Sequence, residues 1–412
     1  MANASVAVDG NGNAIAVWTR TEGAVTTVWG NLYLVGTGWT ATPQPISSGA
    51  NSASAPYVAV NAAGVAIAVW REANKIWARR YTIPTNSLDS TISDLGEADA
   101  NAASPDEAPK PKVAIDASGN ALVVWHEYGS NGIANVNSIW ANRYSGVVWS
   151  GNVLIETGAG NALHPQIAMD GAGNAIAVWQ QDGAAGDEEI RASRFTGAGG
   201  WVPAPNPLDH PTNTEAGVPQ IAMNANGDAI LVWRELLASG GNVIYARRYT
   251  AGTWALNPVA LSTVPGNNAD APQVTIDQSA NGIAVWTQTI GAKIRVMASR
   301  YSSGTWAVAA AIDSNGFGDS AQPRIAMNAG GSAFVVWQSM DTTLPTEQIR
   351  SIWSNRLPVG GSWNPSTAST LENVGPDDAS RPHVAVDATG RAIAVWQQVD
   401  GAVESIFSAR FQ

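Results

Sequence analysis

The chain repeats one pattern of apolar and polar positions eight times, and residues 219–235 show it most clearly. There P-Q-I-A-M is followed by the polar turn N-A-N-G-D and then by the apolar run A-I-L-V-W. Asn bonds readily to its own backbone and Gly adopts positive φ, so these turn residues predict a tight turn. The apolar run predicts a strand buried on both faces. The Trp that ends this strand recurs every 51 to 59 residues, at Trp18, Trp70, Trp125, Trp179, Trp233, Trp286, Trp337 and Trp396.

Each repeat predicts four strands, A to D in chain order, of which B ends at this Trp. Pro219 opens strand A in the fifth repeat, since Pro is tolerated at the first residue of a strand. Strand A is predicted at Ser5–Val8, Tyr57–Val60, Lys112–Ile115, Gln166–Met169, Gln220–Met223, Gln273–Ile276, Arg324–Met327 and His383–Val386. Strand C is predicted at Val28–Tyr33, Ile76–Tyr81, Ile139–Tyr144, Ile190–Phe195, Ile244–Tyr249, Val296–Tyr301, Ile352–Leu357 and Ile406–Phe411. Strand D is predicted to begin at Trp39, Trp149, Trp201, Trp254, Trp306 and Trp363.

Four short antiparallel strands per repeat, with a period near 50 residues, predict an all-β fold of the β-propeller type. Frequent Gly, Pro and Asn exclude long helices. Eight copies predict one eight-bladed domain over residues 1–412, with four-stranded antiparallel blades. The expected blades are about 1–52, 53–107, 108–161, 162–215, 216–268, 269–319, 320–378 and 379–412.

Two repeats depart from this pattern. The second lacks the strand-D Trp and carries an acidic Pro/Ala-rich stretch, 83–111, which predicts a loose strand D with a solvated insertion. The eighth has no segment for strand D, so its blade is expected to have three strands. Strand C at Ser405–Phe411 would then be an open edge. We expect either that the native chain continues beyond residue 412 or that a neighbouring subunit adds a strand there.

The composition narrows the classes of function. A formal net charge of −11 with four Lys argues against nucleic acid as a partner. The chain has no Cys, and its four His show no metal-ligand spacing, so no metal or other cofactor is expected. No apolar run approaches the roughly 18 residues of a membrane span. Abundant Asn, Thr, Ser and Gly with few charges suit an extracellular or cell-surface β protein.

The turn between strands C and D carries a family resemblance. Its segments Y-T-A-G-T-W at 249–254 and Y-S-S-G-T-W at 301–306 resemble the Asp-box turn of the sialidase-type (BNR) propeller repeat. The Gly-Thr-Trp end is kept and the Asp is absent. The resemblance implies a propeller and extends equally to non-catalytic lectin propellers, which bind sugars in pockets between blades. The arginine triad, the acid and the Tyr/Glu pair of a sialidase cannot be placed in this sequence.

An Arg recurs near the end of strand C in seven repeats. Strand alternation gives it the same face as apolar residues, and a partly buried Arg needs partners. Register places Arg80 opposite Ile67, near the A–B turn with its Asn61. We expect a structural latch from each Arg to the Asp or Asn of that turn or to its carbonyls, with binding of an anion or a sugar acid as the alternative. These residues are Arg80, Arg143, Arg194, Arg248, Arg300, Arg356 and Arg410.

The Asp or Asn at each A–B turn invites comparison with calcium loops. Calcium loops use more carboxylates and end in a bidentate Glu, which these turns lack. A turn closed by the Asx side chain explains the pattern without a metal. The 18 Trp also follow the repeat: those ending strand B and opening strand D are expected in the core, and those in strand C are expected to be partly exposed.

Polar residues follow each strand-B Trp, where they are either solvated strand ends or a ring of shallow pockets. Arg and carboxylate side chains together bracket a sugar hydroxyl, since one donates and the other accepts. The candidate ligand-binding residues are Arg71, Glu72, His126, Glu127, Gln180, Gln181, Arg234, Glu235, Gln288, Gln397 and Gln398.

The sequence therefore predicts a secreted or cell-surface binding module for carbohydrate or another surface polymer, with no catalytic residues. Near-equivalent repeats argue against an enzyme, since catalysis needs one distinct set of acid, base and stabilising groups. One alternative is a structural subunit of an extracellular adhesin, sheath or filament. A second alternative is a sialidase-like glycoside hydrolase or a lyase.

Overall fold

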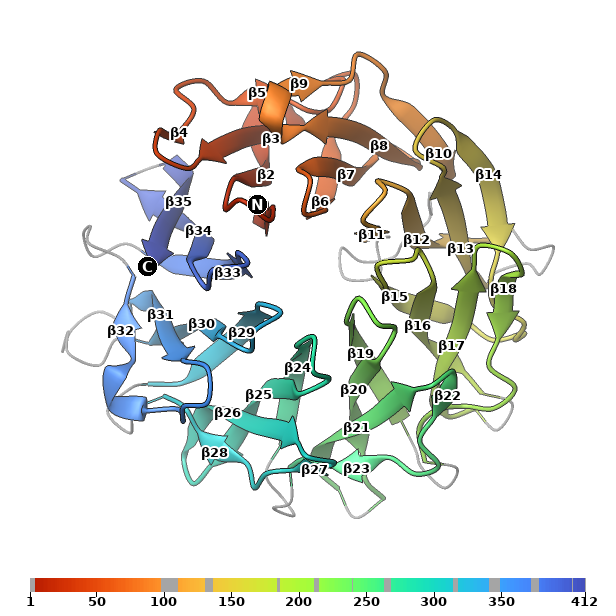
Figure 1. Ribbon diagram of the computed structural model, residues 1–412, viewed down its shortest axis with the longest axis vertical. Coiled ribbons are helices and arrows are strands. Elements are labelled where there is room, and N and C mark those ends of the chain that lie inside the picture. Colours follow the sequence, from red (N-terminus) through yellow and green to blue (C-terminus); the bar gives the residue numbers. More distant parts are fainter. Residues whose placement is uncertain are drawn as a thin grey trace. The chain divides into compact units, whose positions relative to one another are not determined.

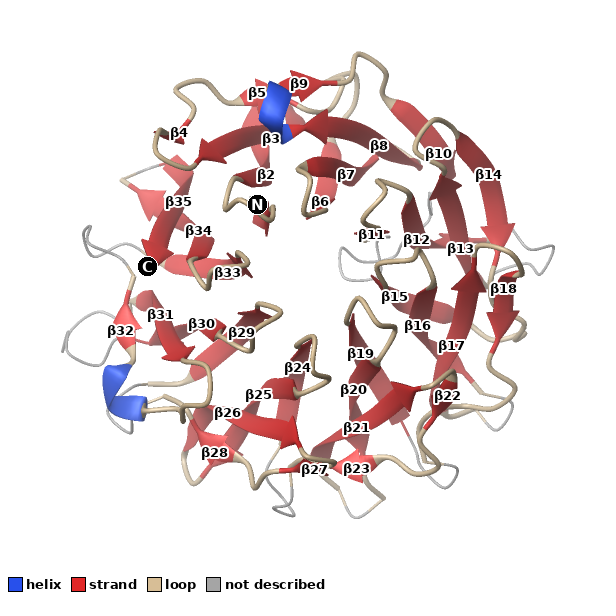
Figure 2. Ribbon diagram, in the orientation of Figure 1, coloured by secondary structure: helices blue, strands red, loops and turns tan. Residues whose placement is uncertain are grey.

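The computed structural model describes residues 4–97, 110–129, 136–183, 186–210, 215–238, 240–262, 268–313, 318–340, 349–371, 378–401 and 403–411. The regular structure in these ranges is β-strand, apart from two 3-10 turns, η1 (Ile83–Thr85) and η2 (Pro365–Thr367) (Figure 2). The all-β class is therefore confirmed. No helix in these ranges is long and apolar enough to cross a membrane.

The chain divides into two compact units, which are described separately. The N-terminal unit is Asn3–Pro219 with Ala225–Gly227, and the C-terminal unit is Gln220–Asn224 with Asp228–Gln412.

The N-terminal unit holds repeats 1 to 4 (Figure 1). Repeats 1 to 3 each form an antiparallel sheet, and the antiparallel strands of repeat 4 continue into β19 (Glu215–Met223) through one parallel pair, Glu188 with Glu215. Repeats 1 and 2 comprise β1 (Ala4–Val8), β2 (Ala14–Glu22), β3 (Val25–Leu34), β4 (Gly38–Trp39), β5 (Gln44–Pro45), β6 (Ala53–Val60), β7 (Val65–Glu72), β8 (Lys75–Thr82), β9 (Ser87–Leu88) and β10 (Ser93–Glu97). Repeats 3 and 4 comprise β11 (Lys112–Ile115), β12 (Ala121–Tyr128), β13 (Asn137–Tyr144), β14 (Trp149–Leu154), β15 (Ala162–Met169), β16 (Ala175–Asp182), β17 (Glu188–Thr196) and β18 (Gly200–Pro203).

The C-terminal unit holds repeats 5 to 8, beginning in β19, the strand that contains the unit boundary. Repeats 5 and 6 comprise β19 (Glu215–Met223), β20 (Ala229–Leu236), β21 (Asn242–Thr250), β22 (Thr253–Trp254), β23 (Val259–Ala260), β24 (Ala269–Ile276), β25 (Gly282–Ile290), β26 (Lys293–Ser302), β27 (Thr305–Trp306) and β28 (Ala310–Ala311). Repeats 7 and 8 comprise β29 (Ser320–Met327), β30 (Ala333–Met340), β31 (Arg350–Leu357), β32 (Ser369–Thr370), β33 (Ala379–Val386), β34 (Ala392–Asp400) and β35 (Val403–Phe411).

Strands A, B and C lie where the sequence predicts them, whereas strand D is more irregular. It is split into two short pieces in repeats 1, 5 and 6. Trp363 does not open a strand, because it lies in the loop before η2. In repeat 2 the position of strand D is taken by β9 and β10, and residues 98–109 of the acidic insertion lie outside the described ranges. The described strands of repeat 8 form a three-stranded sheet, β33-β34-β35.

Proline lies inside strand A in repeats 2 and 4 to 8 and does not open it there, which corrects the expectation from the sequence. In repeat 2 strand β6 begins at Ala53, three residues before Pro56, and its register against β7 shifts between Ser54 and Tyr57. The residue before each such Pro has positive φ, as at Ala55, His164, Val218, Ala271, Gln322 and Arg381. A bulge leaves one residue outside the hydrogen-bond ladder, so the strand tolerates the missing N–H of Pro.

The core lies between consecutive sheets, because each strand B is apolar on both faces. In the N-terminal unit, Trp70 of repeat 2 packs in one cluster with Ile15 and Val17 of repeat 1. In the C-terminal unit, Trp286 of repeat 6 packs with Val232 of repeat 5. No sheet covers its own central strand, so each repeat depends on its neighbour for burial.

The Trp side chains differ by strand. Those that end strand B are buried in seven repeats, and Trp18 is half-buried. Those that open strand D are half-buried, which corrects the expectation of full burial. They pack on the aromatic residue of strand C, as Trp254 does edge-on to Tyr249 with ring centroids 5.1 Å apart. The strand-C Trp are half-buried, so the expected partial exposure is confirmed, at Trp29, Trp77, Trp140 and Trp353.

The turn between strands A and B is closed by its first residue, as predicted. Asp116 Oδ1 accepts hydrogen bonds from the backbone amides of Ser118 and Asn120, each at 2.8 Å. Where Asn replaces Asp, its amide also reaches the following turn: Asn61 Nδ2 donates to the Asp116 carbonyl at 3.1 Å. Asn224 donates to the Asp277 carbonyl at the same distance. These buried side chains link consecutive repeats within each unit.

Asp387 begins the corresponding turn of repeat 8. Its Oδ1 accepts from the amides of Thr389 and Arg391, each at 2.9 Å, and its Oδ2 accepts from Arg391 Nε at 2.6 Å. Burial by itself raises the pKa of this carboxyl. The hydrogen bonds from Arg391 and Thr389 and the charge of Arg391 outweigh burial, so the pKa lies below its ordinary value of about 3.9.

A carboxyl with a depressed pKa in the folded state stabilises the fold above its unfolded pKa, and this contribution is lost as the pH falls through the folded pKa. We expect Asp387→Asn to lower the free energy of unfolding by about 1–3 kcal/mol at neutral pH. The difference between wild type and variant should shrink in acid. Urea unfolding at a series of pH values measures it, and a difference that is constant down to strongly acid pH would contradict the assignment.

Candidate functional site

The polar residue two positions after a strand-B Trp binds the indole of that Trp. Trp70 Nε1 donates to Glu72 Oε2 at 3.1 Å, and Trp233 Nε1 donates to Glu235 Oε2 at 2.9 Å. A buried indole N–H needs an acceptor, so these side chains are drawn inside. The same bond joins Trp179 to Gln181, Trp286 to Gln288 and Trp396 to Gln398. The expectation of a solvated rim is wrong for these residues, while their role in ligand binding stays a prediction.

The other candidate rim residues have mixed surroundings. His126 and Gln397 are buried, and Arg71, Gln180 and Arg234 are half-buried. Arg234 Nη1 lies 3.3 Å from Asp270 Oδ1 of the next repeat. Glu127 is buried with its Oε2 3.4 Å from Trp125 Nε1, and it also lines the cavity described below.

The partner of the recurring Arg differs from repeat to repeat. Arg80 lies opposite Ile67, which confirms the predicted register, but its Nη1 is 3.6 Å from Asp89 Oδ1. In repeat 5 Arg248 Nη2 lies 4.0 Å from Oδ1 of Asp228, the last residue of the A–B turn, so the predicted contact with this turn is found there. Arg194, Arg356 and Arg410 are exposed, and Arg300 is half-buried.

In repeats 3 and 5 the Arg packs over an aromatic ring of the next repeat. The Arg248 guanidinium lies 4.6 Å from the centroid of the Tyr301 ring, and its Nη1 donates to the Tyr301 hydroxyl at 2.7 Å. Arg143 lies 5.6 Å from the centroid of Phe195. A guanidinium over a ring face gains electrostatic energy and covers apolar surface, so these Arg join consecutive sheets.

The residue before this Arg makes a second link that the sequence did not reveal. In repeat 7 Asn355 Nδ2 donates to the Asn364 carbonyl of its own repeat at 3.0 Å and to the Ile312 carbonyl of repeat 6 at 2.8 Å. Its Oδ1 accepts from the Arg356 amide at 2.7 Å. In repeat 1 Asn31 also both donates and accepts, within its own repeat. Its Nδ2 donates to the Thr40 carbonyl, and its Oδ1 accepts from the Leu32 amide at 2.9 Å.

Repeat 3 departs from this arrangement at Asn142. Its Nδ2 donates to Asn152 Oδ1 at 3.0 Å and to the Leu95 carbonyl of repeat 2 at 3.4 Å. The register of β13 against β14 shifts between Asn142 and Tyr144, so strand D runs differently here. Asn142 Oδ1 is buried and accepts no hydrogen bond from any described residue. A buried acceptor without a donor costs about 1–3 kcal/mol, so it needs a functional explanation.

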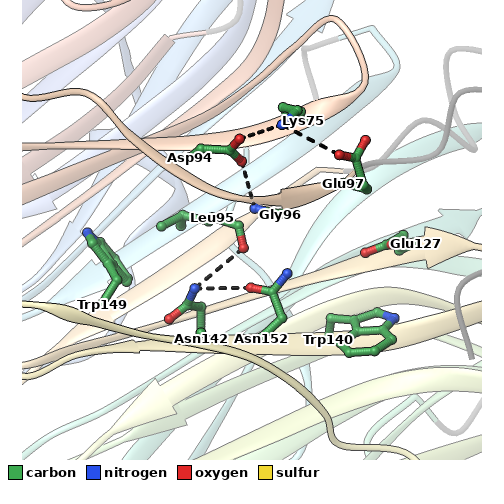
Figure 3. Close-up of a pocket in the computed structure, with 11 residues that line it drawn as sticks. Lys75, Asp94, Leu95, Gly96, Glu97, Glu127, Trp140, Asn142, Trp149 and Asn152 are labelled. Atoms are coloured by element: carbon green, nitrogen blue, oxygen red, sulfur yellow. Dashed lines mark hydrogen bonds and ion pairs between the residues drawn. The ribbon is translucent and has the colours of Figure 1, made fainter.

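Asn142 is among the residues that line a cavity of about 590 Å³ between β10 of repeat 2 and β13 and β14 of repeat 3 (Figure 3). The volume lies within the range of small-molecule sites. In Figure 3 the Asn142 oxygen points away from Asn152 and Leu95. The cavity is lined by Lys75, Asp94, Leu95, Gly96, Glu97, Glu127, Trp140, Asn142, Trp149, Gly151 and Asn152.

The local sequence of β10 brings this wall close to repeat 3. Leu95 is buried in the core between the two sheets and anchors the strand. Gly96 has φ of 138°, a conformation open chiefly to Gly, and its amide donates to Asp94 Oδ1 at 3.0 Å. A Cβ at Gly96 would lie 2.0 Å from Asn152 Nδ2. Gly therefore permits the close approach that narrows this end of the cavity.

Sequence reasoning found only Glu127 among the residues of this cavity. One signal was present, because repeat 2 lacks the strand-D Trp and holds the irregular segment that becomes β10. Among the described residues no group of three or more His, Asp or Glu is placed to hold a metal ion. The cavity offers aromatic faces, carboxylates, an amine and amides, which together suit a polar organic ligand.

Comparison with known proteins shows the fold. No family model and no curated protein sequence matches the chain. An ulvan lyase, from a new family of polysaccharide lyases, superimposes with a TM-score of 0.57 at 9% identity, covering 86% of this chain and 90% of that one. The BP39L lectin of Burkholderia pseudomallei superimposes with a TM-score of 0.53 at 12% identity, covering 89% and 98%. Structures of this kind are β-propellers, so the chain has a propeller fold, and its sheets are blades.

The close approach at Gly96 can be tested by substitution. Gly96→Ala combines an unfavourable φ with the clash against Asn152, and we expect it to lower the free energy of unfolding by about 2–4 kcal/mol. Gly151→Ala is a matched control, since φ there is 92° but no atom lies within 4 Å of the added Cβ. We expect it to cost about 1–2 kcal/mol. Adding Asn152→Ala should recover part of the Gly96→Ala loss, and equal losses for the two Gly variants would refute the close approach.

Proposed function

We propose that the chain is an eight-bladed β-propeller that binds carbohydrate without catalysis, in the cavity between the second and third blades. The observation that carries the proposal is a cavity of ligand size whose lining combines two Trp side chains with the amides of Asn142 and Asn152. Sugar hydroxyls bond readily to amide groups. Trp140 and Trp149 line the same cavity and offer apolar ring faces for the C–H side of a sugar.

The repeat supports both the blade count and the kind of propeller. Eight strand-B Trp recur in one register, and each described sheet packs against the next within its unit. The C–D turn at Gly252 to Trp254 has Gly at positive φ, and Thr253 Oγ1 donates to the Thr250 carbonyl at 3.3 Å. This geometry suits the sialidase-type repeat that the sequence resembles. The composition favours an extracellular or cell-surface location.

Departure from symmetry supports placing the site in this cavity. In blade 2, β10 continues the second part of strand D to Glu97 through a shift in register. In blade 3, Asn142 Oδ1 has no donor among the described residues, whereas the oxygens of Asn31 and Asn355 have one. Together these two features shape the wall of the cavity. The names of the solved lectin and polysaccharide lyase refer to carbohydrate, which agrees with the proposal. Their similarity to this chain is a similarity of fold.

Assembly is a second candidate function, favoured by β35. Among the described strands β35 hydrogen-bonds only to β34, whereas strand C of the earlier repeats also pairs with a strand D. The edge of a sheet is a common place for strand addition. A strand added at Ser405–Phe411 by a neighbouring subunit is our proposal for this alternative.

Trp140→Ala should weaken binding to the glycans found on an array by roughly tenfold, because the aromatic face is lost. Trp353→Ala is the matched control, since Trp353 holds the same register in blade 7, opposite Trp337, as Trp140 holds opposite Trp125. We expect the control to bind as wild type does. A wild-type protein that binds no glycan, or equal losses for the two variants, would count against the proposed site.

Amide exchange along Ser405–Phe411 tests the assembly alternative. We expect the outward-facing amides of β35 to exchange rapidly in dilute protein and slowly at concentrations where larger species form, because an added strand bonds them. Protection that is complete at every concentration would mean that the edge is already covered in the monomer, and this alternative would fail.

A further inference from the structure

The cavity carries an unequal set of charges. Its lining includes three carboxylates, of Asp94, Glu97 and Glu127, and one cation, Lys75. Asn142 Oδ1 adds a neutral acceptor that has no donor. The wall therefore accepts hydrogen bonds more readily than it donates them, and its carboxylates repel anionic groups.

The single cation of the wall is already paired. Lys75 Nζ lies 2.5 Å from Asp94 Oδ2 and 3.5 Å from Glu97 Oε1. The hydrogen bond from Lys75 to Asp94 and the charge of Asp94 raise the pKa of Lys75, so the amine stays protonated and held by its own carboxylates. Lys75 therefore offers little attraction to an acidic ligand.

Glu127 is the carboxylate deepest in the wall. It is 8% exposed, and its Oε2 shares the Trp125 indole N–H with the backbone carbonyl of Glu97, which lies 3.0 Å from that nitrogen. Glu127 and Trp140 lie on the same face of blade 3, because Trp125 pairs directly with Trp140 and Glu127 follows Trp125 by two residues. A carboxylate beside an indole face is an arrangement that favours a cation.

From this geometry we propose that the cavity selects a sugar residue bearing a protonated amine, such as a hexosamine with a free amino group. The inference rests on the proposed function and names the class of ligand. The ammonium lies toward Glu127 and Glu97 and against the face of Trp140. The ring hydroxyls lie toward the amides of Asn142 and Asn152. Glycans with sulfate or carboxylate groups are excluded by the same carboxylates.

Two oligosaccharides that differ only in this charge provide the test. We expect β1,4-linked glucosamine oligomers to bind roughly tenfold more tightly than their N-acetylated counterparts, measured by calorimetry at mildly acid pH. Binding of the amine form should weaken as the pH rises through the pKa of the ligand amine and as salt is added. Polyglucuronate serves as the acidic probe and should not bind.

Glu127→Gln with Glu97→Gln should remove the tenfold preference while keeping the binding of the N-acetylated oligomer. Glu235→Gln is the matched control, because Glu235 accepts from Trp233 as Glu127 does from Trp125 but does not line the cavity. If the double variant fails to fold, the pH dependence of glucosamine-oligomer binding by the wild type tests the amine preference instead. Equal binding of the two oligomers, or tighter binding of polyglucuronate, would overturn the amine preference and leave carbohydrate binding standing. No binding to any glycan would overturn both.

Discussion

A strand that is apolar on both faces is the constraint on which the rest of this structure depends. Strand B cannot be covered by its own sheet, so each blade buries it against the next, as Trp70 of blade 2 does against Ile15 of blade 1. Burying a Trp also removes its indole N–H from water. The indole N–H therefore needs an acceptor inside the protein. Glu72, or its counterpart two residues after the Trp, accepts this hydrogen bond and is buried with the Trp.

Regular links between blades then leave room for local exceptions. The Asx turns, the Arg–aromatic contacts and the strand-C polar residues each join consecutive blades, so no single link has to be the same in every repeat. Blades 2 and 3 differ locally from the others. Strand D of blade 2 is formed by β9 and β10, and Gly96 of β10 comes close to Asn152 of blade 3. Asn142 Oδ1 of blade 3 has no hydrogen-bond donor among the described residues.

Under the proposed function, the placement of charge in that cavity distinguishes it from the same positions in the other described blades. At the position two residues after the strand-B Trp, Glu serves as an indole acceptor in blades 2, 3 and 5. Glu127 alone among these three also lines the cavity. Under the proposed function, the same residue type is structural in one blade and faces a ligand in another.

The sequence by itself determined the repeat, the strand order and the register, down to Arg80 opposite Ile67, because hydrophobic period and turn chemistry are local properties. Tertiary structure decided what those side chains touch. Glu72 became an indole acceptor, Arg248 reached Tyr301 of the next blade, and Pro56 entered a bulge within strand A. The cavity depends on the approach of Gly96 to Asn152, residues 56 positions apart in different blades. Contacts between blades are set by packing across the interface, and no pattern within one repeat encodes them.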